Sequence, residues 1–438
     1  MMSNPTTYLT QIDAEAEETK LKLVRSIMQT DPIGLFKELR ENRPILVLPE
    51  CTLVALYDDV IEMLNMPKIF TVALYKPKMA EGYLMCHDED ALHYREKSLM
   101  QSLLNREDLP RVRQLVTDSA QSILKKAGNK LDAVPDYCRI IPALIVQNYF
   151  GLVGINIKHL MEWSYWAQVD TFYNQPFDIV SPEDRKRIID SHTESGKKLE
   201  EYITALMIGQ SVSLKLHLPW RIITRIKDGI LKLLGRPIVA NDRIVERMLR
   251  SGFPPEMDFD IKRVGINAGG LLIGTIETTA QASVQALQYI LQNPDVLQQA
   301  KTAALSDDTR AFDGIVWEAL RFVPISPYMF RQTAWDYTLA KGTAHATLIK
   351  ANTNVLALTQ SAMFDAKAFE NPDAFISNRN WYHYFTFGYG SHECLGKYIG
   401  MVMIPEIVRQ MLLMPNLKAQ SNMEYEGHMP KSYVVTWA

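Results

Sequence analysis

The sequence predicts a mainly α-helical protein with small β-sheets, folded as one large domain. Helical periodicity of apolar residues dominates the chain, and apolar runs typical of strands are few and short. The 438 residues contain neither an internal repeat nor a linker rich in Pro, Gly and Ser. Because 47% of the residues are hydrophobic and 22% are charged, the chain can bury a large core and need not be disordered, which excludes a peptide or a low-complexity tail.

The first predicted elements follow a polar N-terminal arm. We assign residues 1–30 to this arm and residues 31–438 to the single domain. Within residues 35–64, a short helical pattern precedes the apolar runs ILVLP and CTLVALY. A Pro-Glu pair separates the two runs, which therefore predict a pair of short strands.

Helical patterns then continue to the last hundred residues. The predicted helices span residues 91–104, 109–126, 137–152, 159–173, 182–207, 259–292, 294–304 and 310–322. Short β-type runs return over residues 333–358, and residues 363–384 are irregular and rich in Asn, Asp, Pro and aromatic residues. A final helix is expected to begin near Leu395, and the terminal YVVTWA predicts a strand.

The segment from Ser213 to Arg236 differs from the rest in its charge. It carries six Lys or Arg residues against the single acid Asp228, and its Ile and Leu residues recur at roughly helical spacing. This pattern predicts a basic amphipathic helix. Such a helix either packs on its own domain or touches a membrane surface or an acidic partner.

The overall composition excludes several classes of protein. Forty-seven basic and fifty acidic residues give a formal net charge of -3, which argues against a nucleic-acid-binding protein. The four cysteines lack Cys-x-x-Cys spacing, which excludes a disulfide scaffold or structural zinc and favours a reducing compartment. We find no signal peptide and no apolar stretch of about eighteen residues, so we expect a soluble, cytoplasmic protein without a transmembrane anchor.

One of these cysteines lies in a distinctive segment, FTFGYGSHECLGKYIG. The spacing from Phe387 to Gly396 is F-G-x-G-x-H-x-C-x-G, in which the glycines allow a tight turn and the approach of a bulky group. Cys394 directly precedes a predicted helix, whose N-terminus would stabilise a thiolate. A lone thiolate without zinc-type partners suits haem iron. Most isolated cysteines are instead small buried hydrophobes.

This segment resembles the haem-binding motif of the cytochrome P450 superfamily, the cysteine-thiolate haem monooxygenases. The resemblance implies the single-domain cytochrome P450 fold, a helical haem domain, with haem b (iron protoporphyrin IX) as cofactor and O2 as co-substrate. It further implies that Cys394 is the axial iron ligand, that Phe387 packs beside the sulfur, and that His392 lies near a haem propionate. Gly388 and Gly396 would also border the haem.

Two further motifs carry the same resemblance. In WEALRFVP, Glu318 and Arg321 are three residues apart and so lie on one helix face. Such a pair is usually a solvated surface bridge. Here it is similar to the family's E-x-x-R motif, which implies a buried structural network closed by Arg379.

In the long helix over residues 259–292, four glycines precede Glu277 and Thr278, which indicates close packing or a local distortion. The segment GTIETT is similar to the family's A-G-x-(D/E)-T-T signature. An acid beside a hydroxyl can relay protons through water, so Glu277 and Thr278 are the predicted catalytic residues. One departure is Gly274-Thr275 where the family usually has Ala-Gly.

Propionates are anions that require cationic or hydrogen-bonding partners when buried. The segment ALHYREKSLM resembles the family's C helix, and this resemblance implies propionate contacts from His93 and Lys97. Lysine keeps the charge of the usual Arg but lacks its bidentate fork, so Arg95 is a possible substitute. Arg331 matches a further propionate contact.

Two more departures concern the flanks of the site. The helix after the cysteine contains Gly400 and Pro405, and the proline should break its backbone hydrogen bonding. The segment 213–236 resembles an insertion between the family's G and H helices.

The resemblance implies a monooxygenase that inserts one atom of O2 into a mostly apolar organic substrate by hydroxylation or oxidative demethylation. The sequence contains no flavin or iron-sulfur module, so the electrons are expected from a separate ferredoxin and ferredoxin reductase, or from a flavodoxin. The protein is expected to be a monomer. The predicted docking cations are Arg106, Arg111, Arg113 and Lys397.

Two alternatives stay open: a peroxide-driven peroxygenase and a non-catalytic haem sensor. Substrate choice is assigned to three loops over residues 70–85, 169–180 and 328–330, which contain Phe70, Tyr75, Tyr83, Phe172, Tyr173 and Phe177.

Overall fold

The computed structural model describes residues 7–88, 90–216, 242–251 and 255–438. Its helices of seven residues or more are α1 (Tyr8–Ala14), α2 (Glu17–Thr30), α3 (Pro32–Asn42), α4 (Tyr57–Leu64), α5 (Ala91–Leu103), α6 (Leu109–Ala127), α8 (Ile157–Tyr173), α9 (Pro182–Leu216), α11 (Ile244–Arg250), α12 (Ile261–Gln292), α13 (Pro294–Ala304), α14 (Arg310–Phe322) and α16 (Lys397–Leu412). The predicted fold class, mainly helical with small sheets, is confirmed.

The largest sheet has five strands in the order β1-β2-β8-β5-β3. They are β1 (Ile45–Val47), β2 (Thr52–Val54), β8 (Asn354–Ala357), β5 (Met329–Thr333) and β3 (Phe70–Thr71). The predicted pairing of the first two is observed, antiparallel, with Ile45 opposite Val54. The parallel pairing of β2 with β8 brings segments about three hundred residues apart in the chain into one sheet.

Smaller sheets flank the helices. They consist of β4 (Lys130–Asp132), β12 (Val434–Thr436) and β9 (Lys418–Ala419), of β6 (Tyr337–Leu339) with β7 (Thr347–Ile349), and of β10 (Glu424–Glu426) with β11 (Met429–Ser432). The predicted C-terminal strand is β12.

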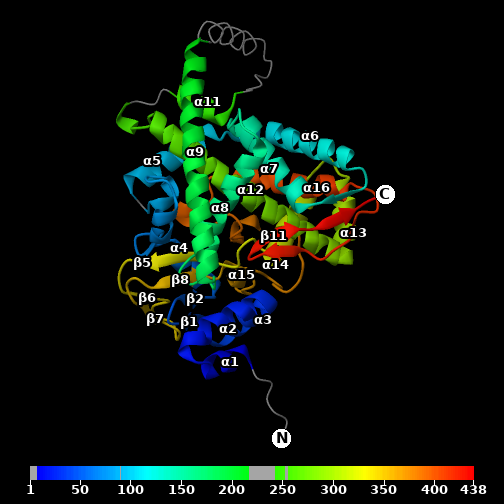
Figure 1. The fold of residues 1–438 in the computed structure, drawn as a ribbon. Coiled ribbons are helices and arrows are strands. Elements are labelled where there is room, and N and C mark those ends of the chain that lie inside the picture. Colours follow the sequence, from blue (N-terminus) through cyan, green and yellow to red (C-terminus); the bar gives the residue numbers. More distant parts are fainter. Residues whose placement is uncertain (1–6, 89, 217–241, 252–254) are drawn as a thin grey trace.

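Helix α12 runs through the helical part of the molecule, where α8, α9, α13, α14 and α16 pack against it (Figure 1). Its 32 residues span about 48 Å at 1.5 Å per residue. The helix begins where the Asp260 side chain accepts a hydrogen bond from the Arg263 backbone N–H. Most of its side chains are buried, which explains why it carries so few charges.

The prediction of a polar arm over residues 1–30 is wrong for residues 8–30, which form α1 and α2. Leu21, Val24 and Met28 lie at helical spacing on α2 and are buried. Figure 1 shows these helices beside α3, at the end of the molecule that holds the five-stranded sheet. Glu17 and Glu18 in the first turn of α2 favour a helix N-terminus. They also make the segment polar on average, so its composition alone conceals the apolar stripe.

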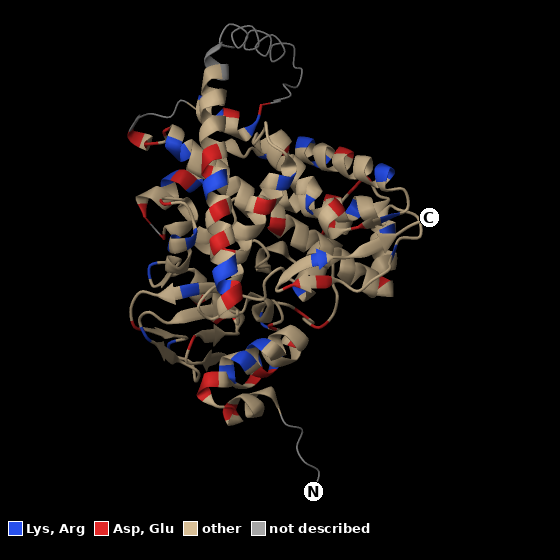
Figure 2. Cartoon of the chain, viewed as in Figure 1, with Lys and Arg blue, Asp and Glu red and all other residues tan. Residues whose placement is uncertain are grey.

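Other boundaries differ locally. The helix expected over 137–152 is divided into α7 (Ile140–Ile145) between two π-helical turns, Val134–Cys138 and Val146–Phe150. Helix α9 continues beyond the predicted end to Leu216, and charges of both signs alternate along it (Figure 2). Helix α16 continues through Pro405, so the proline removes one N–H donor without ending the helix.

Most of the predicted basic segment 213–236 lies outside the described residues. Among the helices that the structure describes, none is long and apolar enough to cross a membrane.

Candidate active site

The cysteine segment forms a tight loop that ends at the start of α16. Gly388 and Gly390 have φ angles of +80° and +68°, a region that side chains with a Cβ rarely adopt. The Cys394 backbone N–H donates to the Phe387 carbonyl at 2.7 Å, which closes the loop. The loop glycines therefore have the backbone role that the motif predicts.

The Cys394 thiol is exposed and nevertheless surrounded by the fold, so it borders an internal hollow. Burial raises the pKa of this thiol, whereas the Gly396 N–H and Lys97 act to lower it. Burial is the largest of these effects, and the Gly396 N–H at the start of α16 opposes it in the direction that the sequence predicts. A bound metal cation would keep the sulfur anionic, because coordination deprotonates a thiol.

Phe387 packs at the start of this loop. Its ring lies 5.6 Å from that of Trp317 and 6.1 Å from that of Trp381, measured between centroids. A Cβ at position 400 would approach the Phe387 ring to 2.8 Å. Gly400, a departure from the family pattern, therefore makes room for Phe387.

The four predicted propionate contacts form one cluster of basic side chains. The His93 and His392 rings are 4.7 Å apart, and Lys97 donates to the carbonyls of Ser391 and Glu393. His93 lies 3.0 Å from the Ser391 carbonyl through Nε2. His93 and Lys97, the two residues of the C-helix motif, thus belong to the cluster and also bind the backbone of the cysteine loop.

The charges of this cluster are poorly compensated. Burial, together with nearby Arg331, His93 and Lys97, lowers the pKa of His392 to about 2, and its buried Nε2 has no hydrogen-bond partner among the described residues. The buried Arg331 donates to the adjacent Phe330 carbonyl at 2.8 Å, and burial lowers its pKa. Asp88 lies 3.9 Å from His392, and Glu393 interacts electrostatically with Lys97.

Arg95 does not join this cluster and instead lies 3.8 Å from Asp258. The cluster and the exposed sulfur together fit a group that carries both a metal and carboxylates. The metal would bind the Cys394 sulfur, and the carboxylates would accept hydrogen bonds from the basic side chains. Gly274 supports this fit: it is exposed in the middle of α12, and a Cβ there would meet nothing within 4 Å.

Glu277 and Thr278 are adjacent in α12 but point to different sides, because successive helical residues diverge by about 100°. The Thr278 hydroxyl donates to the Gly274 carbonyl at 2.7 Å. The Glu277 carboxylate is buried and accepts from Arg139 at 2.6 Å and 3.0 Å. Burial raises the pKa of Glu277, and Arg139 partly offsets that effect.

Arg139 is the functional candidate that the sequence analysis missed, because nothing in DYCRIIP marks it as the partner of a residue 138 positions later. It also borders a surface cavity of about 490 Å³. That cavity lies between α8, the turn before α7 and the β10–β11 hairpin, and Tyr165 beneath Arg139 is part of its wall. The buried acid is thus one side chain away from the surface.

The E-x-x-R pair is fully buried, in contrast to an ordinary surface bridge. Glu318 accepts from Arg321 at 2.8 Å and from Arg379 at 3.1 Å, as the resemblance implies. It also accepts from the Tyr384 hydroxyl at 2.6 Å and from the Ile376 backbone N–H at 2.9 Å. These contacts tie α14 to the irregular stretch before the cysteine loop.

The predicted substrate loops converge only in part. Tyr75 and Phe330 have ring centroids 4.9 Å apart, and Phe172 and Phe177 complete an aromatic cluster with them. Tyr173 instead bonds to Gln281. Phe70 is buried in a separate core and packs against Tyr337.

The predicted docking cations are largely paired. Arg113 binds the buried Glu406 at 2.8 Å, Lys397 binds Glu393 at 2.5 Å, and Arg111 donates to the Asp242 carbonyl. Arg106 lies over the Tyr398 ring at 3.9 Å. The positive face expected from these four residues is therefore weaker than their number indicates.

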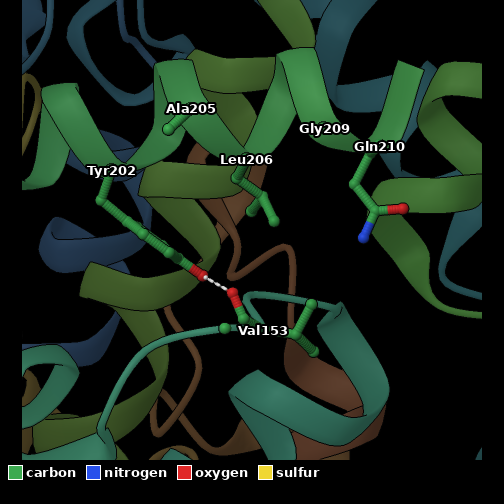
Figure 3. A pocket seen from close by; sticks show the side chains of 7 residues that line it. Val153, Tyr202, Ala205, Leu206, Gly209 and Gln210 are labelled. Atoms are coloured by element: carbon green, nitrogen blue, oxygen red, sulfur yellow. Dashed lines mark hydrogen bonds between the residues drawn. The ribbon is translucent and has the colours of Figure 1, made fainter. Parts of the chain in front are cut away.

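A second cavity, of about 320 Å³, lies between α9 and the turn at Val153 (Figure 3). The Tyr202 hydroxyl donates to the Val153 carbonyl across it at 2.8 Å. No residue of the predicted site lines this cavity.

The other three cysteines are buried free thiols, as expected. Burial raises the pKa of Cys51 to about 12 and that of Cys86 to about 11, and it also raises that of Cys138. The part of the chain that the structure describes contains no group of three or more His, Cys, Asp or Glu residues able to hold a metal ion.

Comparisons with known proteins agree with this geometry. The family model "Cytochrome P450" matches residues 241–436. Cytochrome P450 YjiB of Bacillus subtilis (strain 168) is 23% identical over 83% of this chain and 82% of its own length. The steroid C26-monooxygenase of Mycolicibacterium smegmatis is 28% identical over 34% of this chain and 35% of its own length. The crystal structure of CalO2 covers 94% of this chain and 97% of its own, with a TM-score of 0.74 and 16% identity, which shows a shared fold.

Proposed function

Because the chain belongs to the cytochrome P450 superfamily and is a haem-thiolate monooxygenase, we propose that Cys394 is its iron ligand and that it hydroxylates or oxidatively demethylates a mostly apolar organic substrate. The observation that carries this proposal is the exposed Cys394 sulfur beside a cluster of four basic side chains, in which the buried His392 Nε2 has no hydrogen-bond partner among the described residues.

The residues that would hold haem b are those of the loop and the cluster. We assign the iron to Cys394 and the propionates to His93, Lys97, Arg331 and His392. Phe387, Gly388 and Gly396 would border the group on the sulfur side. When bound, the haem supplies a thiolate-ligated iron that activates O2.

We assign proton delivery to three side chains. Glu277 holds an exchangeable proton at its carboxylate, and its raised pKa favours that role near neutral pH. Arg139 orients the carboxylate and connects it to the surface cavity. Thr278 can accept a proton through water at Oγ1 and pass it on, because its hydroxyl is held on the exposed turn at Gly274.

The substrate is expected to be mostly apolar. The aromatic cluster of Tyr75, Phe172, Phe177 and Phe330 supports this expectation, because aromatic walls favour apolar ligands. The name of the similar steroid C26-monooxygenase points in the same direction.

Electrons are proposed to come from a separate ferredoxin and ferredoxin reductase, or from a flavodoxin. Arg106, whose guanidinium lies over Tyr398, is the strongest of the four docking candidates, because the other three have polar or acidic partners. A cytoplasmic location and a monomeric state stay predictions from the sequence.

Carbon monoxide binding tests the ligand assignment. The reduced holoprotein should show the absorption band typical of thiolate-ligated haem, and Cys394→Ala should abolish it. Cys51→Ala, a buried thiol elsewhere, should keep the band. A band that persists in Cys394→Ala would refute the assignment.

Turnover with different electron sources tests the reaction type. Product should form with O2, a ferredoxin and its reductase. Equal turnover with hydrogen peroxide alone would favour the peroxygenase alternative, and binding of many substrates without product would favour the sensor.

A further inference from the structure

A series of aromatic side chains begins at the cysteine loop and ends at the protein surface. The Trp317 ring on α14 lies 5.6 Å from that of Phe387 and 5.1 Å from that of Trp381, measured between centroids. Trp381 in turn lies 5.4 Å from Tyr384, and these two rings are stacked at 19°. Trp317 is 4% exposed, whereas Trp381 is partly exposed and precedes the exposed Tyr382.

Indole and phenol rings give up one electron far more readily than the ring of phenylalanine. Trp317, Trp381 and Tyr384 therefore form a continuous series of oxidisable groups, which we call the aromatic row. Its inner end contacts Phe387, whose carbonyl accepts from the Cys394 backbone N–H. The aromatic row thus connects the loop of the candidate iron ligand with solvent.

The tyrosine of the aromatic row has a proton acceptor. Its hydroxyl donates to Glu318 Oε2 at 2.6 Å. Burial raises the pKa of Glu318, but hydrogen bonds from Arg321, from a backbone N–H and from Tyr384 lower it by more, so Glu318 is ionised. An oxidised phenol is a strong acid and transfers its proton to a carboxylate at this distance. Oxidation of Tyr384 then leaves a neutral radical instead of a buried phenol cation, which would be costly.

We propose that the aromatic row protects the haem site by supplying electrons to a haem that a peroxide has oxidised while no substrate is bound. This inference rests on the proposed function, because it requires haem at Cys394. Each electron passes from Tyr384 through Trp381 and Trp317 to the haem. The hydroxyl proton of Tyr384 passes to Glu318.

The reaction balances with a reductant of the ascorbate class in solution. Two electrons and two protons convert a peroxide ROOH to ROH and water. The reductant reaches the partly exposed Trp381, returns each electron to the aromatic row and releases the protons that the peroxide consumes. The proton on Glu318 then returns to Tyr384, so the row is restored.

Electron paramagnetic resonance of rapidly frozen samples tests the aromatic row. The ferric holoprotein is mixed with peracetic acid without substrate or reductase. The wild-type protein should show a tyrosyl radical, and ring-deuterated tyrosine should narrow its signal. Trp317→Phe and Trp381→Phe should lose the tyrosyl signal, because phenylalanine does not donate the electron. Tyr384→Phe should show a tryptophanyl signal in its place.

Two matched variants control for the loss of a buried ring or hydroxyl. Trp163 is also 4% exposed and also contacts a tyrosine, with its ring 5.7 Å from that of Tyr202. The buried Tyr149 hydroxyl also donates to a carboxylate, that of Asp108, at 2.9 Å. Trp163→Phe and Tyr149→Phe should both keep the tyrosyl radical.

Loss of the aromatic row should also leave the haem open to damage. In peracetic acid with ascorbate present, Trp381→Phe should bleach its haem faster than the wild type. Trp163→Phe should bleach at the wild-type rate.

The outcomes separate this inference from the proposed function. A wild-type protein without a tyrosyl radical, or a radical that persists in either Trp317→Phe or Trp381→Phe, would overturn the inference. Equal bleaching of Trp381→Phe and the wild type would also contradict it. Absence of the ferric haem-thiolate signal from the same wild-type spectra would instead count against the haem site itself.

Discussion

Two buried clusters of charged side chains differ in how completely they are paired. Around Glu318, two arginines, a tyrosine hydroxyl and a backbone N–H bind the two carboxylate oxygens. Around His392, a second histidine, a lysine and an arginine gather, with Asp88 3.9 Å from His392 and Glu393 near Lys97. A cluster whose charges are balanced stabilises the fold, whereas an unbalanced one requires a ligand of opposite charge.

Removal of one partner from the paired cluster should have the largest effect. Glu318→Ala leaves Arg321 and Arg379 buried without an acid, which should lower the free energy of unfolding by about 3–5 kcal/mol. Urea denaturation measures this change, and the purified variant should lack haem. Asp190→Ala, which breaks an exposed pair with Lys186, should change stability by less than about 1 kcal/mol.

The unbalanced cluster should respond in the opposite way. Arg331→Gln removes a buried guanidinium whose pKa is lowered by burial more than it is raised by nearby Tyr75 and Asp88, so the haem-free protein should be as stable as the wild type or more stable. Haem should dissociate about tenfold faster or more, because a charge-assisted hydrogen bond contributes about 1.5–3 kcal/mol. Haem transfer to a scavenger protein measures the rate. A strongly destabilised haem-free variant would contradict the comparison.

The Arg139–Glu277 pair is intermediate in charge balance between these two clusters, because one arginine pairs with one acid. Arg139→Gln should leave Glu277 protonated to higher pH, because Arg139 acts to lower its pKa. The optimum pH of turnover should rise, and product formed per electron consumed should fall up to about tenfold. Arg187→Gln, near the same cavity but paired with Asp184 at the surface, should change neither quantity.

Asp313 should give the smallest effect. Burial raises its pKa from 3.8 to about 6, and Arg113, 3.6 Å away, offsets this only in part. The folded protein therefore binds this proton more tightly than the unfolded chain. Stability should fall as pH rises from about 4 to 6, by no more than about 2 kcal/mol because the side chain is partly exposed.

Asp313→Asn should remove this pH dependence and equal or exceed the stability of the wild type at pH 7. Thermal unfolding across that pH range measures the difference. An unchanged slope in Asp313→Asn would show that another group titrates there.

Local patterns predicted what depends on neighbours in the sequence. The glycine frame around Cys394 and the spacing of Glu318 and Arg321 are visible in a few consecutive residues, because a turn or a helix face is built from them. The long helices and the first strand pair were predicted for the same reason. Residues 8–30 were assigned wrongly, since composition conceals an amphipathic helix whose outer face is charged.

The sequence by itself determined the fold class, the cysteine that serves as the candidate ligand and the residue types around it, because each depends on short-range geometry. Only the tertiary structure decided that Glu277 faces Arg139 and not the Thr278 hydroxyl, and that Tyr83 lies on Gly270. It also showed which charged clusters are balanced. These contacts join residues far apart in the chain, and whether a buried charge is compensated depends on every element that packs around it.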